Sequence, residues 1–270
     1  MKEKILEIYH RETNNYTRED LDIFDKFKAK LEKGEIRAAE KKDGVWTVNA
    51  WVKKGILLGF KIGKIVEMKI SETKKFTDKS TYPERNFSPD SKIRMVPGGS
   101  SVRSGAYIAP GVTMMPPMYV NAGAYVDSGS MIDSHALVGS CAQIGKNVHL
   151  SAGAMIGGVL EPVGARPVII EDNVFAGGNS GIYEGVTVKE GAIIAAGVII
   201  TSGMPIYDAV AGKYLEKSPG KPTEIPENAV VVAGTRPLKS NKDFSVYCPI
   251  IIKYRDQKSD LSVILEDELR

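Results

Sequence analysis

A carboxylate, an arginine and a pair of glycines in the middle of the chain are the first candidates for chemistry. Asp133 directly follows the apolar Ile132, and Arg94 opens the motif Arg-Met-Val-Pro. A positioned carboxylate can take a proton from an amine, and a guanidinium binds a carboxylate bidentately. Gly157 and Gly158 would let a ligand approach the backbone closely. Residue type alone leaves plainer readings open: a turn aspartate bonded to its own backbone, a solvated arginine and glycines of a tight turn.

Histidines and cysteines supply fewer candidates. The chain has only His10, His135 and His149, and no close histidine pair that would indicate a zinc site, so we expect no metal. Cys141 and Cys248 lie far apart in the sequence, which is typical of reduced thiols in a cytoplasmic protein. A lone catalytic thiol remains the alternative.

Composition limits the fold and the partners. Among the 270 residues, 27 are glycine and only 7% are aromatic, which favours a repetitive β architecture built from small residues. The net charge of +3 is too weak to indicate a nucleic-acid partner. The N-terminus has no apolar segment typical of a signal peptide, and no run approaches 18 apolar residues. We therefore expect a cytoplasmic protein with no membrane partner.

A period of six residues begins at Val96 and continues to Met204. Of the nineteen positions in this series, seventeen are apolar, whereas a chain with 43% apolar residues would give about eight by chance. The two exceptions are Pro162 and Ser180. Neither a helix nor an ordinary strand has this period. A triangular coil does, with one hexapeptide per flat face, three faces per turn and one branched residue per face pointing to the axis. About six turns are expected.

The segment 157–167 interrupts the pattern with Pro162, Gly164 and Pro167, although the register of six appears undisturbed across it. Two interpretations fit: two irregular faces of the coil, or an external loop of about one hexapeptide. The prolines and the glycine favour the loop.

The flanking segments predict a small α/β domain over residues 1–93 and a capping segment over 205–270, on either side of the coil at 94–204. In the first, we expect helices over 3–9, 17–31 and 50–60, a hairpin over 36–49 that turns at 42–44, and a loop over 69–92. Thr17 and Asp20 are spaced as a capping box for the second helix. In the last, we expect strands over 229–233 and 247–254 and a helix over 260–269, which would cover the open end of the coil.

Seven motifs together make the chain resemble the 2,3,4,5-tetrahydropyridine-2,6-dicarboxylate N-succinyltransferase family, in order and with nearly the same spacing. They are VWTVNAWVKK at 45–54, RMVPG at 94–98, GAYIAP at 105–110, YVNAGAYVD at 119–127, VGSCAQIGKNVHL at 138–150, IGGVLEP at 156–162 and VVVAG at 230–234. The resemblance implies a mainly β protein with a left-handed parallel β-helix of hexapeptide repeats. It implies a homotrimer that binds coenzyme A between neighbouring coils. The implied reaction moves a succinyl group from succinyl-CoA to the amino group of a ring-opened substrate, in lysine and diaminopimelate synthesis.

The resemblance also implies roles for the residues introduced above. The family's catalytic, substrate-binding aspartate falls on Asp133, and its carboxylate-binding arginine on Arg94, with one extra residue between the two. Gly157 and Gly158 would admit the pantetheine arm of coenzyme A. Its phosphates would meet three basic residues, each of which alone would be interpreted as solvated: Arg166, Arg236 and Lys239. His135 stands where the family commonly has tryptophan, so we expect a surface or interface histidine there rather than the catalytic base.

One departure bears on the acyl donor. The family often has an arginine and an acidic residue where this chain has Asn179 and Gly181, and Glu184 need not replace the latter. Two alternatives therefore stay open: a related acyltransferase that uses acetyl-CoA or another amine, such as an amino sugar, and a non-catalytic β-helix scaffold. The module at 46–60 argues against the amino-sugar enzyme, and the interruption at 157–167 argues against the scaffold.

Overall fold

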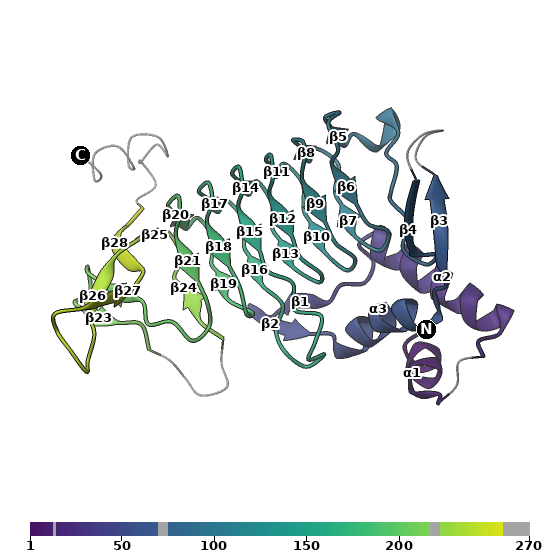
Figure 1. Cartoon of the computed structure of the whole chain (residues 1–270), viewed down its shortest axis with the longest axis horizontal. Helices are drawn as coiled ribbons and strands as arrows, with labels where there is room; N and C mark the ends of the chain where they lie inside the picture. Colours follow the sequence, from purple (N-terminus) through teal and green to yellow (C-terminus); the bar gives the residue numbers. More distant parts are fainter. Residues whose placement is uncertain (13–14, 70–74, 217–221, 256–270) are drawn as a thin grey trace.

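The computed structural model describes residues 1–12, 15–69, 75–216 and 222–255. The expected helix at 260–269 lies outside the described residues. A long three-sided coil of short parallel strands forms the body of the molecule, with three helices and one hairpin at its N-terminal end and a second hairpin beneath its middle (Figure 1). The protein is mainly β, as the period of six indicates.

Three helices form the N-terminal core: α1 (Lys2–His10), α2 (Arg18–Glu32) and α3 (Ala50–Ile62). The capping box of α2 is confirmed, since Thr17 Oγ1 accepts from the Asp20 amide at 3.2 Å and the Asp20 carboxylate accepts from the Thr17 amide at 2.8 Å. Helix α3 packs against α2 through Gly55, where an added Cβ would lie 2.4 Å from the Phe27 ring. A larger residue there would force the two helices apart.

Two hairpins accompany the helices. The expected one is confirmed as β1 (Ala39–Lys42) and β2 (Val45–Val48), and Asp43 and Gly44 turn it with φ of 48° and 78°. Those positive φ values belong to a type I′ turn, which matches the twist of a two-stranded ribbon. The expected loop over 69–92 is partly wrong, because β3 (Ile65–Lys69) pairs with β4 (Lys75–Lys79) and a short 3-10 helix, η1, follows (Pro89–Ser91). Strand β4 is largely exposed, so its sequence carries no apolar alternation.

Each face of the coil stacks one strand per turn, in parallel and in register. The first face contains β5 (Arg94–Met95), β8 (Thr113–Met114), β11 (Met131–Ile132), β14 (His149–Leu150), β17 (Phe175–Ala176) and β20 (Ile193–Ile194). The second contains β6 (Ser101–Val102), β9 (Tyr119–Val120), β12 (Leu137–Val138), β15 (Met155–Ile156), β18 (Gly181–Ile182) and β21 (Ile199–Ile200). The third contains β7 (Tyr107–Ile108), β10 (Tyr125–Val126), β13 (Gln143–Ile144), β16 (Ile169–Ile170), β19 (Thr187–Val188) and β24 (Glu224–Ile225).

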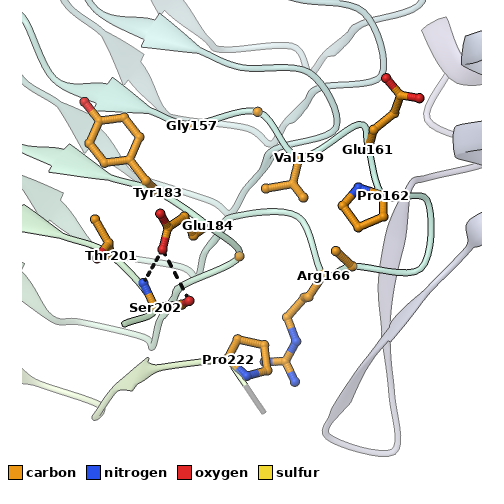
Figure 2. A pocket seen from close by; sticks show the side chains of 13 residues that line it. Gly157, Val159, Glu161, Pro162, Arg166, Tyr183, Glu184, Thr201, Ser202 and Pro222 are labelled. Carbon is orange, nitrogen blue, oxygen red and sulfur yellow. Dashed lines mark hydrogen bonds between the residues drawn. The ribbon is translucent and has the colours of Figure 1, made fainter. Parts of the chain in front are cut away.

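An external loop leaves the coil after β15 and returns before β16, as Figure 2 shows along Val159, Glu161 and Pro162. On the third face, Tyr125 pairs with Gln143 across one regular turn, and Gln143 pairs with Ile169 across the turn that carries the loop. The second step along the chain is longer than the first by eight positions, which is the length that the loop adds. Of the two interpretations of this segment, the external loop is the right one, and it is slightly longer than one hexapeptide.

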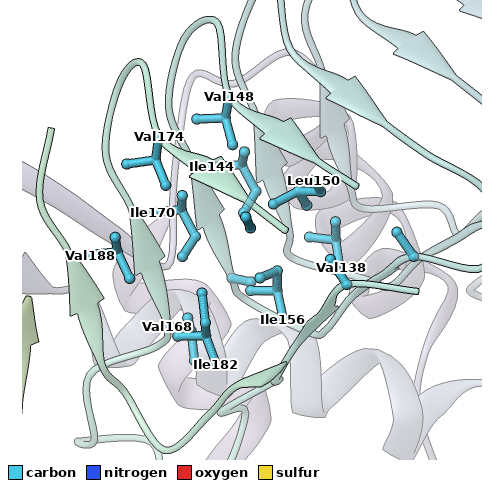
Figure 3. Packing of buried hydrophobic residues seen from close by; sticks show 14 of the residues in the cluster. Val138, Ile144, Val148, Leu150, Ile156, Val168, Ile170, Val174, Ile182 and Val188 are labelled. Atoms are coloured by element: carbon cyan, nitrogen blue, oxygen red, sulfur yellow. The ribbon is translucent and has the colours of Figure 1, made fainter. Parts of the chain in front are cut away.

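Eight is not a multiple of six, so the expectation of an undisturbed register is wrong. The coil has two buried apolar positions per hexapeptide, one on the strand and one in the preceding turn (Figure 3). Before the loop, the series of six follows the strand position, as at Ile144 and Ile156. After it, the series follows the turn position, as at Val168 and Val174, while the strands present Ile170 and its successors. Both rows are buried, and each branched residue contributes roughly 1.5–3 kcal/mol to stability.

The beginning of the series also needs a correction. Met95, not Val96, pairs with the inward Met114 and packs on the core of the coil. The step from Met95 to Met114 is one position longer than the regular step, such as that from Val102 to Val120, so one extra residue lies between β5 and β6. That residue is accommodated at Gly98 and Gly99, where the chain turns with positive φ.

The parallel stacking continues past residue 204. Strand β24 adds to the third face, and β25 (Ala229–Val232) adds to the first. The C-terminal strand β28 (Ile250–Tyr254) then pairs antiparallel with β25 and parallel with β22 (Tyr207–Asp208), which pairs with β23 (Lys213–Tyr214). A last hairpin joins β26 (Thr235–Pro237) and β27 (Ser245–Tyr247). Both expected strands, at 229–233 and 247–254, are present, and β28 covers the open edge of β25.

Candidate active site

A cavity of about 950 Å³ opens at the corner where the chain passes from the second face to the third, hereafter the second corner (Figure 2). The external loop forms one wall, and the turns after β18 and β21 form the other. Its lining is Gly157, Gly158, Val159, Glu161, Pro162, Ala165, Arg166, Tyr183, Glu184, Gly185, Thr201, Ser202 and Pro222. Three of the expected coenzyme-binding residues, Gly157, Gly158 and Arg166, are therefore brought together.

A buried lysine holds the loop from behind. Lys53 of α3 is 0% exposed, and its Nζ donates to the Ala165 carbonyl oxygen at 2.6 Å. Burial lowers the pKa of Lys53, and the nearby Cys141 thiol only partly offsets this effect. Burying an ammonium is costly unless it is hydrogen-bonded, and the hydrogen bond to the Ala165 carbonyl partly offsets this cost for Lys53. The contact links the N-terminal helices to the wall of the cavity.

Arg166 closes the loop against the end of the coil. Its Nη1 donates to Glu224 Oε1 at 2.8 Å and to Thr187 Oγ1 at 3.0 Å. Lys189 Nζ lies 3.1 Å from the other oxygen of Glu224. Burial alone would raise the pKa of Glu224, but the hydrogen bonds from Arg166 and Lys189 outweigh it and keep that pKa below its usual value. The guanidinium is thus fixed at the cavity wall, with only 18% of its side chain exposed.

Gly158 is explained by packing even without a ligand. A Cβ at Gly158 would lie 2.5 Å from the Ser140 amide nitrogen of the turn below, so the two backbones touch. At Gly157, a Cβ would lie 2.8 Å from the Tyr183 ring. Both positions exclude side chains for steric reasons, and they leave bare backbone on the cavity wall.

Two further side chains shape the cavity and were not expected from the sequence. Glu184 accepts hydrogen bonds from the Ser202 amide at 3.2 Å and from its hydroxyl at 3.4 Å, which joins two successive turns (Figure 2). The Tyr183 ring lies over Gly181, where an added Cβ would meet Tyr183 Cε2 at 2.5 Å. The position of the Tyr183 ring therefore leaves no room for a side chain at 181, which gives a steric reason for the departure at Gly181.

Asp133 lies at a different corner, where the chain passes from the first face to the second, hereafter the first corner. Its Oδ1 accepts from the Ser134 amide at 2.7 Å, which is the turn-aspartate geometry considered above. Its Oδ2 lies 4.0 Å from Nε2 of His149 on β14, the next turn of the coil. That nitrogen is buried and has no hydrogen-bond partner. The carboxylate is 31% exposed, so solvent or a ligand can still reach it.

Arg94 lies on the same side of the coil as Asp133. Through the ladder of the first face, Arg94 pairs with Thr113 and Thr113 with Met131, two residues before Asp133. Two strand spacings separate Arg94 from β11, or roughly 10 Å. The arginine is exposed and points outward, opposite to the inward Met95.

The other expected residues are placed apart from the cavity. Arg236 is in β26, where its Nη1 bonds only weakly to the Pro237 carbonyl at 3.5 Å, and Lys239 follows in an exposed turn. Neither lines the cavity. His135 is exposed at the first corner with φ of 61°. Asn179 has a similar φ of 56°, in the first-corner turn after β17.

Cys141 is not a nucleophile. It is fully buried between the coil and the N-terminal helices, and burial raises the pKa of its thiol to about 12. A thiolate is therefore absent near neutral pH. Within the described residues no group of three or more histidines, cysteines, aspartates and glutamates could hold a metal ion. The same part of the chain contains no helix long and apolar enough to cross a bilayer.

Several of these residues could have been found with signals already in the sequence. Lys53 lies within the largely apolar segment at 50–62, and lysine is almost never fully buried unless it is paired, so the residue could have been singled out although its partner could not. Glu184 and Tyr183 follow directly on the departure at Gly181. The cavity itself depends on the length of the external loop. That length could not be predicted, because the period of six continues across the loop by coincidence.

Several known proteins with similar sequences share one name. A family model described as Tetrahydrodipicolinate N-succinyltransferase N-terminal matches residues 1–62, and one described as Hexapeptide repeat of succinyl-transferase matches residues 167–202. Three curated relatives are called 2,3,4,5-tetrahydropyridine-2,6-dicarboxylate N-succinyltransferase. The one from Paraburkholderia phymatum is 47% identical over 89% of this chain and 86% of its own length. The one from Methylococcus capsulatus is 50% identical over the same shares, and the one from Edwardsiella ictaluri is 45% identical over 99% and 94%.

Proposed function

Because the chain belongs to the 2,3,4,5-tetrahydropyridine-2,6-dicarboxylate N-succinyltransferase family, we propose that its cavity and Asp133 form the site of that reaction. The protein is an acyl-transferring enzyme, an N-succinyltransferase of the lysine and diaminopimelate pathway. The observation that carries the assignment to a site is the cavity at the second corner, walled by the glycine backbone and Arg166.

In this proposal, succinyl-CoA is the donor and the ring-opened amino dicarboxylate is the acceptor. The acceptor nitrogen attacks the thioester carbonyl, the new C–N bond forms and the C–S bond breaks; coenzyme A leaves as the thiolate and becomes the thiol by taking up the proton that the nitrogen loses. The attacking nitrogen must lose a proton, and Asp133 Oδ2 is the free carboxylate oxygen that can accept it or orient the amine. Arg94 would bind an acceptor carboxylate as a planar fork. The proposal requires no metal ion for these steps.

Coenzyme A is assigned to the second-corner cavity. The pantetheine arm would run along the bare backbone of Gly157 and Gly158, where amide and carbonyl groups are within reach because no side chain intervenes. Arg166 would face the anionic end of the cofactor from the loop wall. Arg236 and Lys239 lie outside this cavity, so they would contact coenzyme A phosphates only where the cofactor extends beyond it.

The two halves of the site lie at different corners of one coil. Asp133 follows β11 at the first corner, whereas the cavity begins after β15 at the second, and the whole width of the second face separates the two. A single chain cannot bring its own donor and acceptor sites together. We therefore assign the complete site to the contact between copies of the chain, in a cyclic homotrimer.

Finer features of the architecture belong to the same proposal. The hexapeptide period and the matched hexapeptide family model support a left-handed coil. Residues 1–93 would act as a separate α/β domain and the coil would begin at 94; β24 and β25 extend the coil past the expected end at 204, and β28 covers its edge. The enzyme would act in the cytoplasm, with small molecules and its own copies as partners and without nucleic acid or a membrane.

The decisive experiment is a thiol-release assay with the cyclic imine dicarboxylate as acceptor. Succinyl-CoA and acetyl-CoA are compared as donors, because Gly181 stands where the family often has a carboxylate and the Tyr183 ring lies over it. We expect acceptor-dependent release of coenzyme A with succinyl-CoA. A preference for acetyl-CoA would replace the donor in this proposal, and absence of acceptor-dependent release with either donor would refute the function.

A further inference from the structure

The His149 ring lies beside Asp133 and has no role yet in the proposed reaction. It points outward from the first face, directly above Met131, and the Phe175 ring of the next turn lies edge-on to it with centroids 5.1 Å apart. Its Nε2 is buried and has no partner, although 40% of the side chain as a whole is exposed. An unpaired buried nitrogen is costly, and such groups concentrate where a function requires them.

The nearest complementary atom is the free oxygen of Asp133. The separation of 4.0 Å from Nε2 to Oδ2 is too long for a direct hydrogen bond. Among the described residues, the first face offers no other ionic partner for His149. The neighbouring strands present Phe175 on β17 and Thr113 on β8, and Arg94 lies two strands beyond β11. A movement of either side chain by about 1 Å would complete the bond.

We propose that His149 is a positioning residue for Asp133, and that its Nε2–H donates a hydrogen bond to Asp133 Oδ2 when the acceptor amine is bound. Together with the Ser134 amide on Oδ1, this bond fixes both carboxylate oxygens and leaves one lone-pair direction on Oδ2 for the amine. His149 acts through Asp133 and does not touch the acceptor. The inference rests on the proposed function for its effect on rate.

Two variants separate hydrogen bonding from packing. His149→Phe keeps an aromatic ring against Met131 and Phe175 but removes the donor, whereas His149→Gln keeps a donor near the position of Nε2 and loses the ring. We expect His149→Phe to lower kcat by about 10- to 100-fold, because a misplaced catalytic group costs about that much, while His149→Gln stays within about threefold of the wild type. KM for succinyl-CoA should change little in either variant, since the cavity lies at another corner.

A purely structural role predicts the opposite order, with His149→Phe active and His149→Gln impaired, and that result would overturn the proposal. The double variant Asp133→Asn, His149→Phe should be no slower than Asp133→Asn alone, because His149 has no other route to the reaction. Multiplicative losses in the double variant would also overturn it. His135→Gln, on the exposed histidine of the same corner, is the matched control and should keep wild-type kinetics.

A spectroscopic measurement tests the contact independently of the reaction. The chain has three histidines, so long-range ¹H–¹⁵N spectra of the imidazoles can be assigned with His10→Gln and His135→Gln. With the acceptor bound, we expect the His149 proton on Nε2 in the wild type and a redistribution toward Nδ1 in Asp133→Asn. An unchanged His149 spectrum in Asp133→Asn would refute the contact. If the spectrum changes but the wild type transfers no acyl group, the proposed function is refuted while the contact between His149 and Asp133 remains supported.

Discussion

Asp133 has one oxygen bound to its own turn and one oxygen free. Replacing Asp133 with asparagine keeps the size and the turn hydrogen bond but removes the proton acceptor. We expect kcat to fall by about 10²- to 10⁴-fold, or roughly 3–5 kcal/mol of barrier, with affinity for coenzyme A and thermal stability near the wild type. Steady-state kinetics and a thermal melt measure both. A variant that retains more than about a tenth of the wild-type rate would remove Asp133 from the mechanism.

Glu171 is the buried anchor between the β1–β2 hairpin and the coil. It accepts from Trp46 Nε1 at 2.7 Å and from Lys41 Nζ at 2.9 Å. Burial would raise the pKa of Glu171, but these hydrogen bonds dominate and hold it below the ordinary value of 4.5. A lowered carboxyl pKa contributes stability above that ordinary value, and the contribution is lost as the pH falls through the lowered one.

We therefore predict that Glu171→Gln lowers the free energy of unfolding by about 1–3 kcal/mol at pH 7, and that this deficit shrinks as the pH falls below 4.5. Urea denaturation at several pH values measures the deficit. In a Trp51→Phe background, Trp46 fluorescence reports the hairpin alone. A deficit that stays constant into acid would show that the carboxylate charge is not what holds the hairpin.

The sequence located individual residues better than it located the cavity. Asp133 and Arg94 could be placed because each stands in a motif of fixed register, and the turn hydrogen bond of Asp133 follows from its residue type. Lys53 and Glu184 could not be placed in the same way, because their partners, Ala165 and Ser202, come from loops whose paths the sequence pattern does not define.

Among the elements, helix α3 has a second role as the support of the external loop. Lys53→Met keeps most of the buried volume but removes the donor to the Ala165 carbonyl. We expect KM for succinyl-CoA to rise about tenfold, which corresponds to one charge-assisted hydrogen bond of about 1.4 kcal/mol, with kcat within about twofold. Stability should be equal or higher, because the variant no longer buries a charge.

Initial-rate kinetics and limited proteolysis of the loop measure these effects. Lys54→Met is the matched control, since Lys54 is the next residue of the same helix and contacts His10 rather than the loop. If Lys53→Met and Lys54→Met behave alike, the loop does not depend on the buried lysine.

Element prediction succeeded where a periodic pattern or a local cap specified the structure, as in the capping box of α2 and the hairpin that turns at Asp43 and Gly44. It failed at β4, because a solvent-exposed hairpin has no buried face to impose an alternation. The register after the loop failed for a different reason. A coil with two buried rows per hexapeptide offers two equally apolar series, two positions apart, and an insertion of eight residues moves the count from one to the other.

For the whole molecule, the separation of Asp133 from the cavity leads to a complementation test. Thr201→Trp would fill the cavity and so block coenzyme A, whereas Asp133→Asn would remove the proton acceptor at the first corner. Either variant alone should therefore be inactive. Coexpressed at equal levels, the two chains should regain about a quarter of wild-type activity. In a random cyclic trimer, one contact in four joins an intact cavity to an intact Asp133.

Light scattering should give a mass of three chains for the wild type and for both variants. Trimers that form normally but show no regained activity would place the whole site within one chain. The pattern of one chain's sequence does not define this site, because in the proposed trimer its two halves meet only when copies associate.

The spacing of paired strands also sets an order of assembly. From β6 to β15, and again from β16 to β21, the steps between paired strands are equal, as from Thr113 to Met131, so each new turn can settle on the one before it once a short stretch of chain is available. The external loop lengthens this step for one turn only, as from Gln143 to Ile169.

By contrast, the contact between Lys41 of the β1–β2 hairpin and Glu171 joins residues 130 positions apart. Closing so long a loop costs conformational entropy, and the contact that offsets this cost cannot form before the turn that contains β16 has folded. The coil should therefore grow turn by turn, as a nascent chain would allow, and the hairpin should close over it last. During refolding, the fluorescence change of Trp46 would then follow the circular dichroism signal of the coil.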